Sequence, residues 1–150
     1  MKKMISKKII GDIVEKHETE VSFDRVMEKL EEAVSKNDFS IASIHDLKST
    51  YQKQNLELND DFEYKIVQIC NAEKSHNALT NMSFDLGIMM PKSIVVARKD
   101  GVTSLRFMKM KPWMVSMMFP DIDIVPMSKM VTKIMRKIVL EAIETAQDCI

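Results

Sequence analysis

Glycine, cysteine and long apolar runs are all scarce in this chain. Its three glycines are too few and too scattered to build a glycine-rich phosphate-binding loop. Its two cysteines, Cys70 and Cys149, match neither a disulfide framework nor the spacing of zinc ligands. No window reaches the ~18 consecutive apolar residues that a transmembrane helix requires. We therefore expect a protein without a disulfide scaffold or a membrane span.

An excess of charge is also missing, because 22 basic residues balance 22 acidic residues. A balanced chain lacks the basic surplus typical of proteins that bind nucleic acids, so no nucleic-acid partner is expected. The first ten residues are basic, but a polar stretch follows them in place of the apolar core of a signal peptide. These features predict a protein of the reducing cytoplasm.

The composition predicts one folded domain over residues 1–150. Hydrophobic residues make up 45% of the chain and charged residues 29%, which is typical of a soluble globular protein. A chain of 150 residues is long enough for one hydrophobic core, and no linker or internal repeat divides it.

Hydrophobic periodicity predicts an α+β fold. Ser22 is expected to cap the first helix, and Asp100-Gly101 to form a hairpin turn. The strands do not alternate regularly with long helices, so we predict an antiparallel β-sheet with helices packed on one face, in a β-α-β-rich order with a long C-terminal helix. The expected strands cover about 8–20, 39–46, 63–70, 94–97 and 103–108, and the expected helices about 23–35, 47–55, 73–81, 113–119 and 126 onward, with a turn at 87–91.

Cys70 is the strongest candidate for a functional residue. It ends a predicted strand directly before a helix, and a thiol beside a helix N-terminus is favoured as the thiolate. Asn71, Lys92 and the pair His45-Asp46 are the other candidate ligand-binding residues. Free cysteines are also among the most buried residue types, so core packing is the alternative role for Cys70.

The sequence allows two alternative roles for these residues, a metal or haem site and a thiol-based active site. His45, His76 and Cys70 are candidate metal or haem ligands, or His45 acts as the base of a Cys70 nucleophile, with Asp46 orienting the imidazole. Adjacent residues of a strand point to opposite faces, which weakens the His45-Asp46 pair. No serine triad or HExxH helix is present, so no catalytic residue is assigned and a non-enzymatic role is favoured.

Methionine is abundant, with 14 residues, and five of them crowd one segment. Thioethers suit Cu(I), but the spacing here is that of a hydrophobic core or an adaptable interface. Trp113 is expected to anchor the same apolar cluster. The five methionines are Met108, Met110, Met114, Met117 and Met118.

The order of charged residues along the last helix is opposite to the order that the helix dipole favours. Basic residues come first and acidic residues last, whereas the dipole favours the opposite order. Antiparallel pairing of this helix with its copy across a two-fold axis would set each basic half against an acidic half, and a solvated face is the alternative. The candidate interface residues are Lys129, Lys133, Arg136, Lys137, Glu141, Glu144 and Asp148.

Taken in order, several motifs resemble the domain-of-unknown-function 302 family over about residues 20–147. They are Ser22-Phe23, the Ile-His-Asp-Leu-Lys run at 44–48, Ile69-Cys70-Asn71, the segment 87–96 and Lys111-Pro112. The resemblance implies a small α+β fold of the TATA-binding-protein-like type that is often dimeric, and it implies no established activity. This chain has Ala72 and Lys92 where the family commonly has a proline and a second cysteine, so a two-cysteine site is not expected.

Three functions follow as hypotheses. The first is a homodimeric cytoplasmic module that binds a small ligand, or a cofactor such as haem, in a pocket near Cys70 and His45. The second is a thiol-dependent enzyme or sulfur carrier that uses Cys70, with Lys92 or His45 lowering the thiol pKa. The third is a protein-interaction module that uses the methionine-rich surface and needs no ligand.

Overall fold

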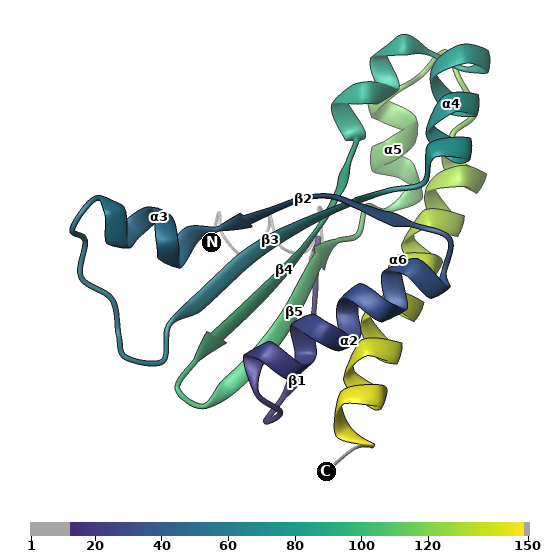
Figure 1. Ribbon diagram of the computed structural model, residues 1–150. Helices are drawn as coiled ribbons and strands as arrows, with labels where there is room; N and C mark the ends of the chain where they lie inside the picture. The colour runs from purple at the N-terminus through teal and green to yellow at the C-terminus, as the bar shows by residue number, and fades with distance from the viewer. Residues whose placement is uncertain (1–12, 149–150) are drawn as a thin grey trace, which may run out of the picture.

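The computed structural model describes residues 13–148 and contains a five-stranded antiparallel sheet in the order β1-β5-β4-β3-β2 (Figure 1). The predicted α+β class, antiparallel sheet and long C-terminal helix are confirmed. The strands are β1 (Val14–Thr19), β2 (Ser40–Asp46), β3 (Glu63–Cys70), β4 (Lys92–Lys99) and β5 (Val102–Met108). The helices are α2 (Phe23–Lys36), α3 (Leu47–Lys53), α4 (Ala72–Asn81), α5 (Pro112–Met118) and α6 (Val125–Gln147), with a 3-10 helix η1 (Phe84–Met89).

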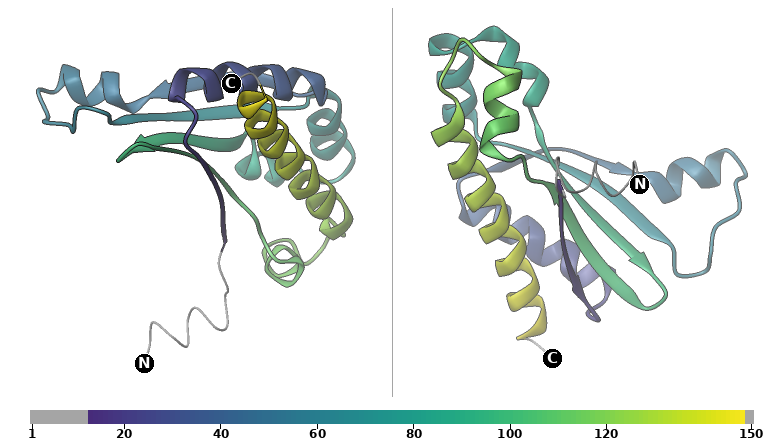
Figure 2. Two further views of the ribbon diagram at one scale, coloured as in Figure 1. Left: turned by 90° about the horizontal axis from the view of Figure 1, so that it is seen from below. Right: turned by 180° about the vertical axis from the view of Figure 1, so that it is seen from behind.

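One face of the sheet packs against α2 and α6 to form the main core. Successive residues of a strand point to opposite faces, so each central strand contributes every second side chain to this core. The two helices also pack against each other, as Figure 2 shows. The strand residues are Val67, Ile69, Ile94, Val96, Leu105 and Phe107, and the helix residues include Val26, Leu30, Ile138, Val139 and Ala142.

Helix α2 is fixed to α6 near both of its ends. The Ser22 hydroxyl accepts a hydrogen bond from the Arg25 backbone N–H, which confirms the predicted cap. Arg25 Nε donates to the Ala146 carbonyl oxygen at 3.0 Å, near the end of α6. At the other end of α2, Asn37 Nδ2 donates to a Glu141 carboxylate oxygen at 3.1 Å.

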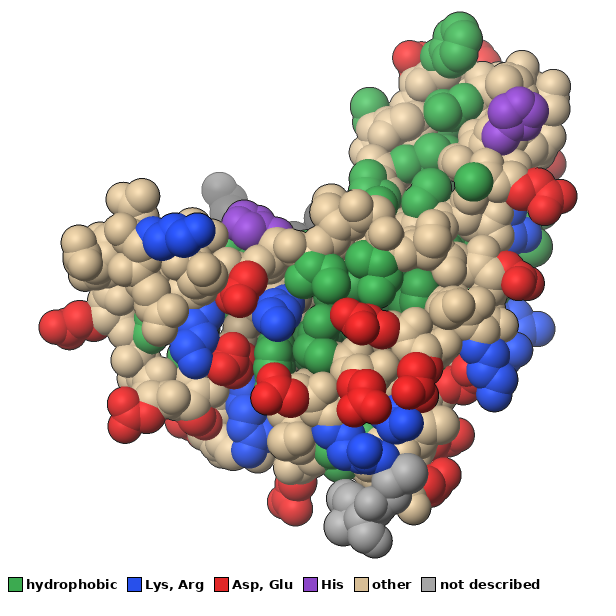
Figure 3. All heavy atoms as spheres, viewed as in Figure 1, with side chains coloured by type: hydrophobic (Ala, Val, Ile, Leu, Met, Phe, Trp, Pro, Cys, Tyr) green, Lys and Arg blue, Asp and Glu red, His purple; other side chains and the backbone are tan. Residues whose placement is uncertain are grey.

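A second, smaller core lies beyond the end of the sheet, where α4, η1, α5 and the start of α6 meet. Its buried residues are Ala78, Leu86, Val115, Phe119 and Ile124. On the face shown in Figure 3, exposed apolar side chains extend from the middle of the molecule to this end. Phe84 and Ile88 of η1 are 85% and 77% exposed. Within residues 13–148, no helix combines the length and apolarity needed to cross a membrane.

One expected turn changes in the structure, and one expected boundary lies outside the described residues. The described first strand covers Val14–Thr19, and its expected start near residue 8 falls within residues 1–12, which, like Cys149 and Ile150, lie outside the described part of the chain. The turn expected at 87–91 is replaced by η1, which extends to Met89. Only Met90-Pro91, joined by a cis peptide bond, then separates η1 from β4.

Trp113 does not anchor the apolar cluster as expected, and the methionine-rich segment is only partly buried. Trp113 is 43% exposed and Met117 is 73% exposed. The inward positions belong instead to Val115 of α5 and to Phe119, which directly follows the helix. Along α6, Met130 is 42% exposed, whereas Met135 is buried.

The edge strand β1 is joined to α6 by a two-pronged ion pair. Arg136 Nε lies 3.0 Å from each carboxylate oxygen of Glu15, and Arg136 Nη2 lies 2.6 Å from Oε1. His17 Nε2 lies 2.8 Å from Glu15 Oε2. The Arg136 guanidinium is the main reason that the pKa of Glu15 is lowered to about 2, against an opposing effect of burial and with a further contribution from His17.

Replacing Glu15 with Gln should lower the free energy of unfolding by about 1–2 kcal/mol at pH 7, because the carboxylate that binds Arg136 is lost. Water screens the ion pair, because the Arg136 side chain is 44% exposed. The loss in free energy of unfolding is therefore smaller than the full pKa shift of Glu15 would correspond to. The pKa of Glu15 is lower in the folded state, so its contribution is present above pH 4.5 and is lost as the pH falls toward 2.

Urea unfolding of wild type and Glu15→Gln between pH 7 and pH 3 measures this difference. Glu18→Gln is the matched control, because Glu18 lies on the same strand but pairs with exposed Lys16. We expect a smaller effect for the control. A Glu15→Gln effect that is the same at pH 7 and pH 3 would contradict the assignment.

Candidate functional site

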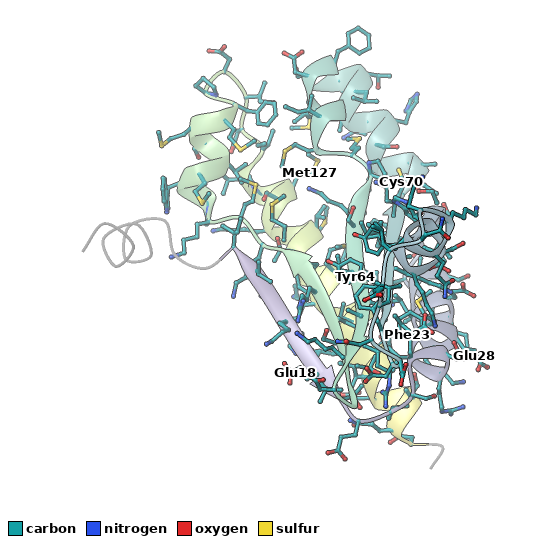
Figure 4. The ribbon with its side chains drawn as sticks, turned by 90° about the vertical axis from the view of Figure 1, so that its left-hand side faces the viewer. Glu18, Phe23, Glu28, Tyr64, Cys70 and Met127 are labelled. Carbon is teal, nitrogen blue, oxygen red and sulfur yellow. The ribbon has the colours of Figure 1, made fainter. Side chains whose placement is uncertain are left out.

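A cavity of about 540 Å³ lies at the end of the sheet where β3 ends and β4 begins. Its walls come from the β3–α4 junction, the η1–β4 segment, the end of β5 and the N-terminal half of α6. Figure 4 shows Met127 in the space between the α4–η1 and α5 sides, and Cys70 at the base of α4. The cavity therefore lies between the sheet and the second core.

The walls of this cavity are mostly apolar and rich in methionine. Flexible thioether side chains adapt to irregular ligand shapes, and a few polar groups in an apolar wall are typical of small-molecule sites. The methionines are Met89, Met90, Met108, Met110, Met127 and Met135, and the uncharged polar residues are Asn71, Ser75, Ser93, Ser128 and Thr132.

Cys70 and Asn71 both lie in the cavity wall. Cys70 is a free, half-buried thiol, and it follows Ile69, whose side chain is buried in the main core. Asn71 also caps α4, because its Oδ1 accepts from the Lys74 backbone N–H at 2.9 Å. Its Nδ2 donates to the Asp38 carbonyl oxygen at 3.1 Å, so this residue joins α4 to the turn before β2.

His45 and Asp46 lie elsewhere. His45 pairs with Ile66 across the sheet, whereas Cys70 pairs with Ser40, so His45 lies four β3 residues away from Cys70, or about 13 Å at the usual rise per residue. His45 is exposed, does not line the cavity and has its Nε2 3.3 Å from the Thr50 hydroxyl. Asp46 caps α3 by accepting from the Ser49 backbone N–H. The strand register therefore separates this pair from Cys70.

The described residues do not bring a metal-ligand set together. Between residues 13 and 148, no group of three or more His, Cys, Asp and Glu side chains is placed to hold a metal ion. His76 is exposed on α4 and is not part of the cavity wall. No histidine lines the described cavity wall, so a haem held there would depend on Cys70, Tyr64 or a methionine to bind its iron.

Lys92 is the candidate whose surroundings are most informative. It is the first residue of β4 and lines the cavity half-buried. Burial lowers the pKa of its amine, because the charged form loses water. Lys74 and Arg106, which sequence reasoning missed, line the same cavity. A charged residue that opens an apolar strand directly after a proline is the one local signal for Lys92.

Three of the candidate interface residues already have partners within the chain. Arg136 binds Glu15, and Lys137 Nζ lies 3.9 Å from a Glu141 carboxylate oxygen. Glu141 also accepts the hydrogen bond from Asn37. These contacts offset part of the inverted charge order. The other four, which are exposed and form no ion pair among the described residues, are Lys129, Lys133, Glu144 and Asp148.

The sequence profile described as "Domain of unknown function DUF302" matches residues 15–142. This chain belongs to that family. The fold is similar to that of the uncharacterized conserved protein DUF302 from Bacillus stearothermophilus, with a TM-score of 0.67 and 20% sequence identity over 88% of this chain and 96% of that one. At this identity the similarity establishes the fold alone. No curated protein matches the chain.

Replacing Asn71 with Ala should destabilise the fold by about 1–2 kcal/mol, because α4 loses its cap and the tie to Asp38 is broken. Equilibrium urea unfolding measures the loss. Asn77→Ala is the control: Asn77 is exposed within α4 and its side chain accepts a hydrogen bond from the exposed Asn81 side chain, and alanine has the higher helix propensity, so stability should change little. Equal losses in both variants would contradict the capping role.

Proposed function

We propose that this protein is a binding module that holds a small, largely apolar molecule in the cavity between the end of the sheet and α6. The observation that carries the proposal is the cavity itself, because its volume of about 540 Å³ is that of a ligand site and its walls are mainly apolar. The proposal assigns no catalytic step to the chain.

The second core supports this proposal because it is incompletely filled. Met89, Met90, Met110 and Met127 pack only partly buried against it, and all four line the cavity. Apolar surface left in contact with water costs about 25 cal/mol per Å² relative to burial. An apolar ligand that covers these side chains would gain this free energy on binding.

Cys70 contributes wall surface in this proposal rather than a reaction. Its half-buried thiol lies where a bound molecule would cover it. Occupancy of the cavity should therefore slow alkylation of Cys70. A thiol-dependent enzyme would show a further property, which is faster alkylation of Cys70 than of free cysteine near neutral pH.

N-phenyl-1-naphthylamine, an uncharged probe that fluoresces in apolar surroundings, should bind saturably at one site. Thr132→Trp places a large side chain in the cavity wall and should weaken binding by about tenfold or more. Thr145→Trp makes the same change at an exposed position near the other end of α6 and should leave the affinity unchanged. Fluorescence titration measures both.

Three results of these experiments would contradict the binding proposal. Urea unfolding first establishes that both tryptophan variants are folded. Non-saturable binding to the wild type, or equal weakening by the two substitutions, would overturn the proposal. Saturating probe that leaves the alkylation rate of Cys70 unchanged would place the site elsewhere.

Homodimerisation in the cytoplasm remains a prediction from the sequence, and we propose α6 as its interface. Lys129 and Lys133 precede Glu144 and Asp148 along this helix, so antiparallel pairing would set opposite charges together. Leu140, which is 38% exposed, supplies apolar surface between them. Sedimentation should show a dimer that weakens between about 0.05 and 0.5 M salt. A dimer equally tight at both concentrations would remove the electrostatic part of this proposal.

A further inference from the structure

The charges around the cavity are all of one sign. Its described wall contains the cationic side chains of Lys74, Lys92 and Arg106 and no Asp or Glu. The whole chain, by contrast, carries equal numbers of acidic and basic residues, 22 of each. A wall that sampled the chain evenly would hold acids beside these bases. The cavity is therefore electrostatically complementary to an anion.

Lys92 is the cation that lies closest to the buried part of the protein. Its cross-strand neighbour on β3 is Ile69, which is fully buried in the main core. Among residues 13–148, the Lys92 side chain forms no ion pair or hydrogen bond, whereas the half-buried Lys48 of α3 pairs with Glu63 at 2.8 Å. An ammonium group that is partly removed from water is costly unless a counter-charge is present. A bound anion would supply that counter-charge.

The other two cations line different parts of the cavity wall. Lys74 lies in the first turns of α4, and its Nζ is 3.8 Å from the sulfur of Met130, so the side chain reaches from α4 to α6. Arg106 of β5 pairs with Val95 of β4 on the sheet face opposite the main core. Cations at the rim of a cleft raise the local concentration of an anionic ligand and speed its association.

We infer that the ligand of the proposed binding function is an amphipathic anion, with an apolar body among the methionines and a carboxylate-type head group paired with Lys92. This inference rests on the proposed function, and it adds the chemical class of the ligand. Lys74 and Arg106 attract the ligand, and Lys92 fixes the end of the molecule that carries the charge.

Two probes that differ only in one anionic group test this inference. 1-Anilinonaphthalene-8-sulfonate is N-phenyl-1-naphthylamine with a sulfonate added, so the ratio of their dissociation constants isolates the effect of the charge. Wild type should bind the anionic probe at least about tenfold more tightly, since a hydrogen bond to a charged group has that order of strength. Lys92→Met should remove this preference and leave the affinity for the neutral probe within about twofold.

Lys99→Met is the matched control, because Lys99 is the exposed residue at the other end of β4 and the change in net charge is identical. The control should keep the preference for the anionic probe. Lys92→Arg, which retains the positive charge, should keep most of it and provides a second test if Lys92→Met unfolds. Decanoate should displace the neutral probe at about tenfold lower concentration than decanol.

The outcomes separate the two proposals. If the neutral probe does not bind the wild type, the proposed function itself fails. If both probes bind with equal affinity, or if Lys99→Met reduces the preference as much as Lys92→Met does, the binding function stands and the inference about an anion is overturned. Equal displacement by decanoate and decanol would overturn it as well.

Discussion

The packing of α2 and α6 against the sheet is the constraint on which the rest of the structure depends. Arg25 and Asn37 bind α6 at positions 146 and 141, so the C-terminal half of that helix is fixed in the main core. The same helix continues as a rigid rod toward its N-terminus, where Met127 and Val131 line the cavity. One wall of the cavity is therefore positioned by a core that lies at the other end of the helix.

Local patterns predicted the elements of this fold because each element carries its own signal. The apolar alternation of β3, the hydroxyl cap of Ser22 and the prolines at the starts of α5 and α6 all act over a few residues. The Glu15–Arg136 ion pair joins residues 121 positions apart, and no local pattern specifies it. Helix α6 also faces two different environments along its length, because its first turns lie against the second core and its later turns lie in the main core.

The residues that line the candidate cavity were predictable from the sequence only at the strand ends. Cys70, Asn71 and Lys92 lie at the adjacent ends of β3 and β4, and all three line the cavity. His45 had the right chemistry, but the pairing of β2 with β3 places it beside Ile66, and cross-strand register is not encoded in a single segment. Lys74 and Arg106 could not be recognised, because charged residues on a helix or an outer strand face normally indicate a solvated surface.

The cavity and Lys92 together mark a place where the described part of the protein departs from its most stable arrangement. An unfilled apolar space and an unpaired, partly buried ammonium group each destabilise a fold, and an apolar side chain at position 92 would remove the second cost. Two other partly buried ionic groups do have partners of opposite charge, because Glu15 pairs with Arg136 and Lys48 pairs with Glu63. Unfilled apolar spaces and unpaired charged groups concentrate at functional sites, because a ligand binds to groups that have no partner within the folded chain. On this physical ground the end of the sheet near Lys92, rather than the exposed His45 corner, is where a ligand would stabilise the protein most.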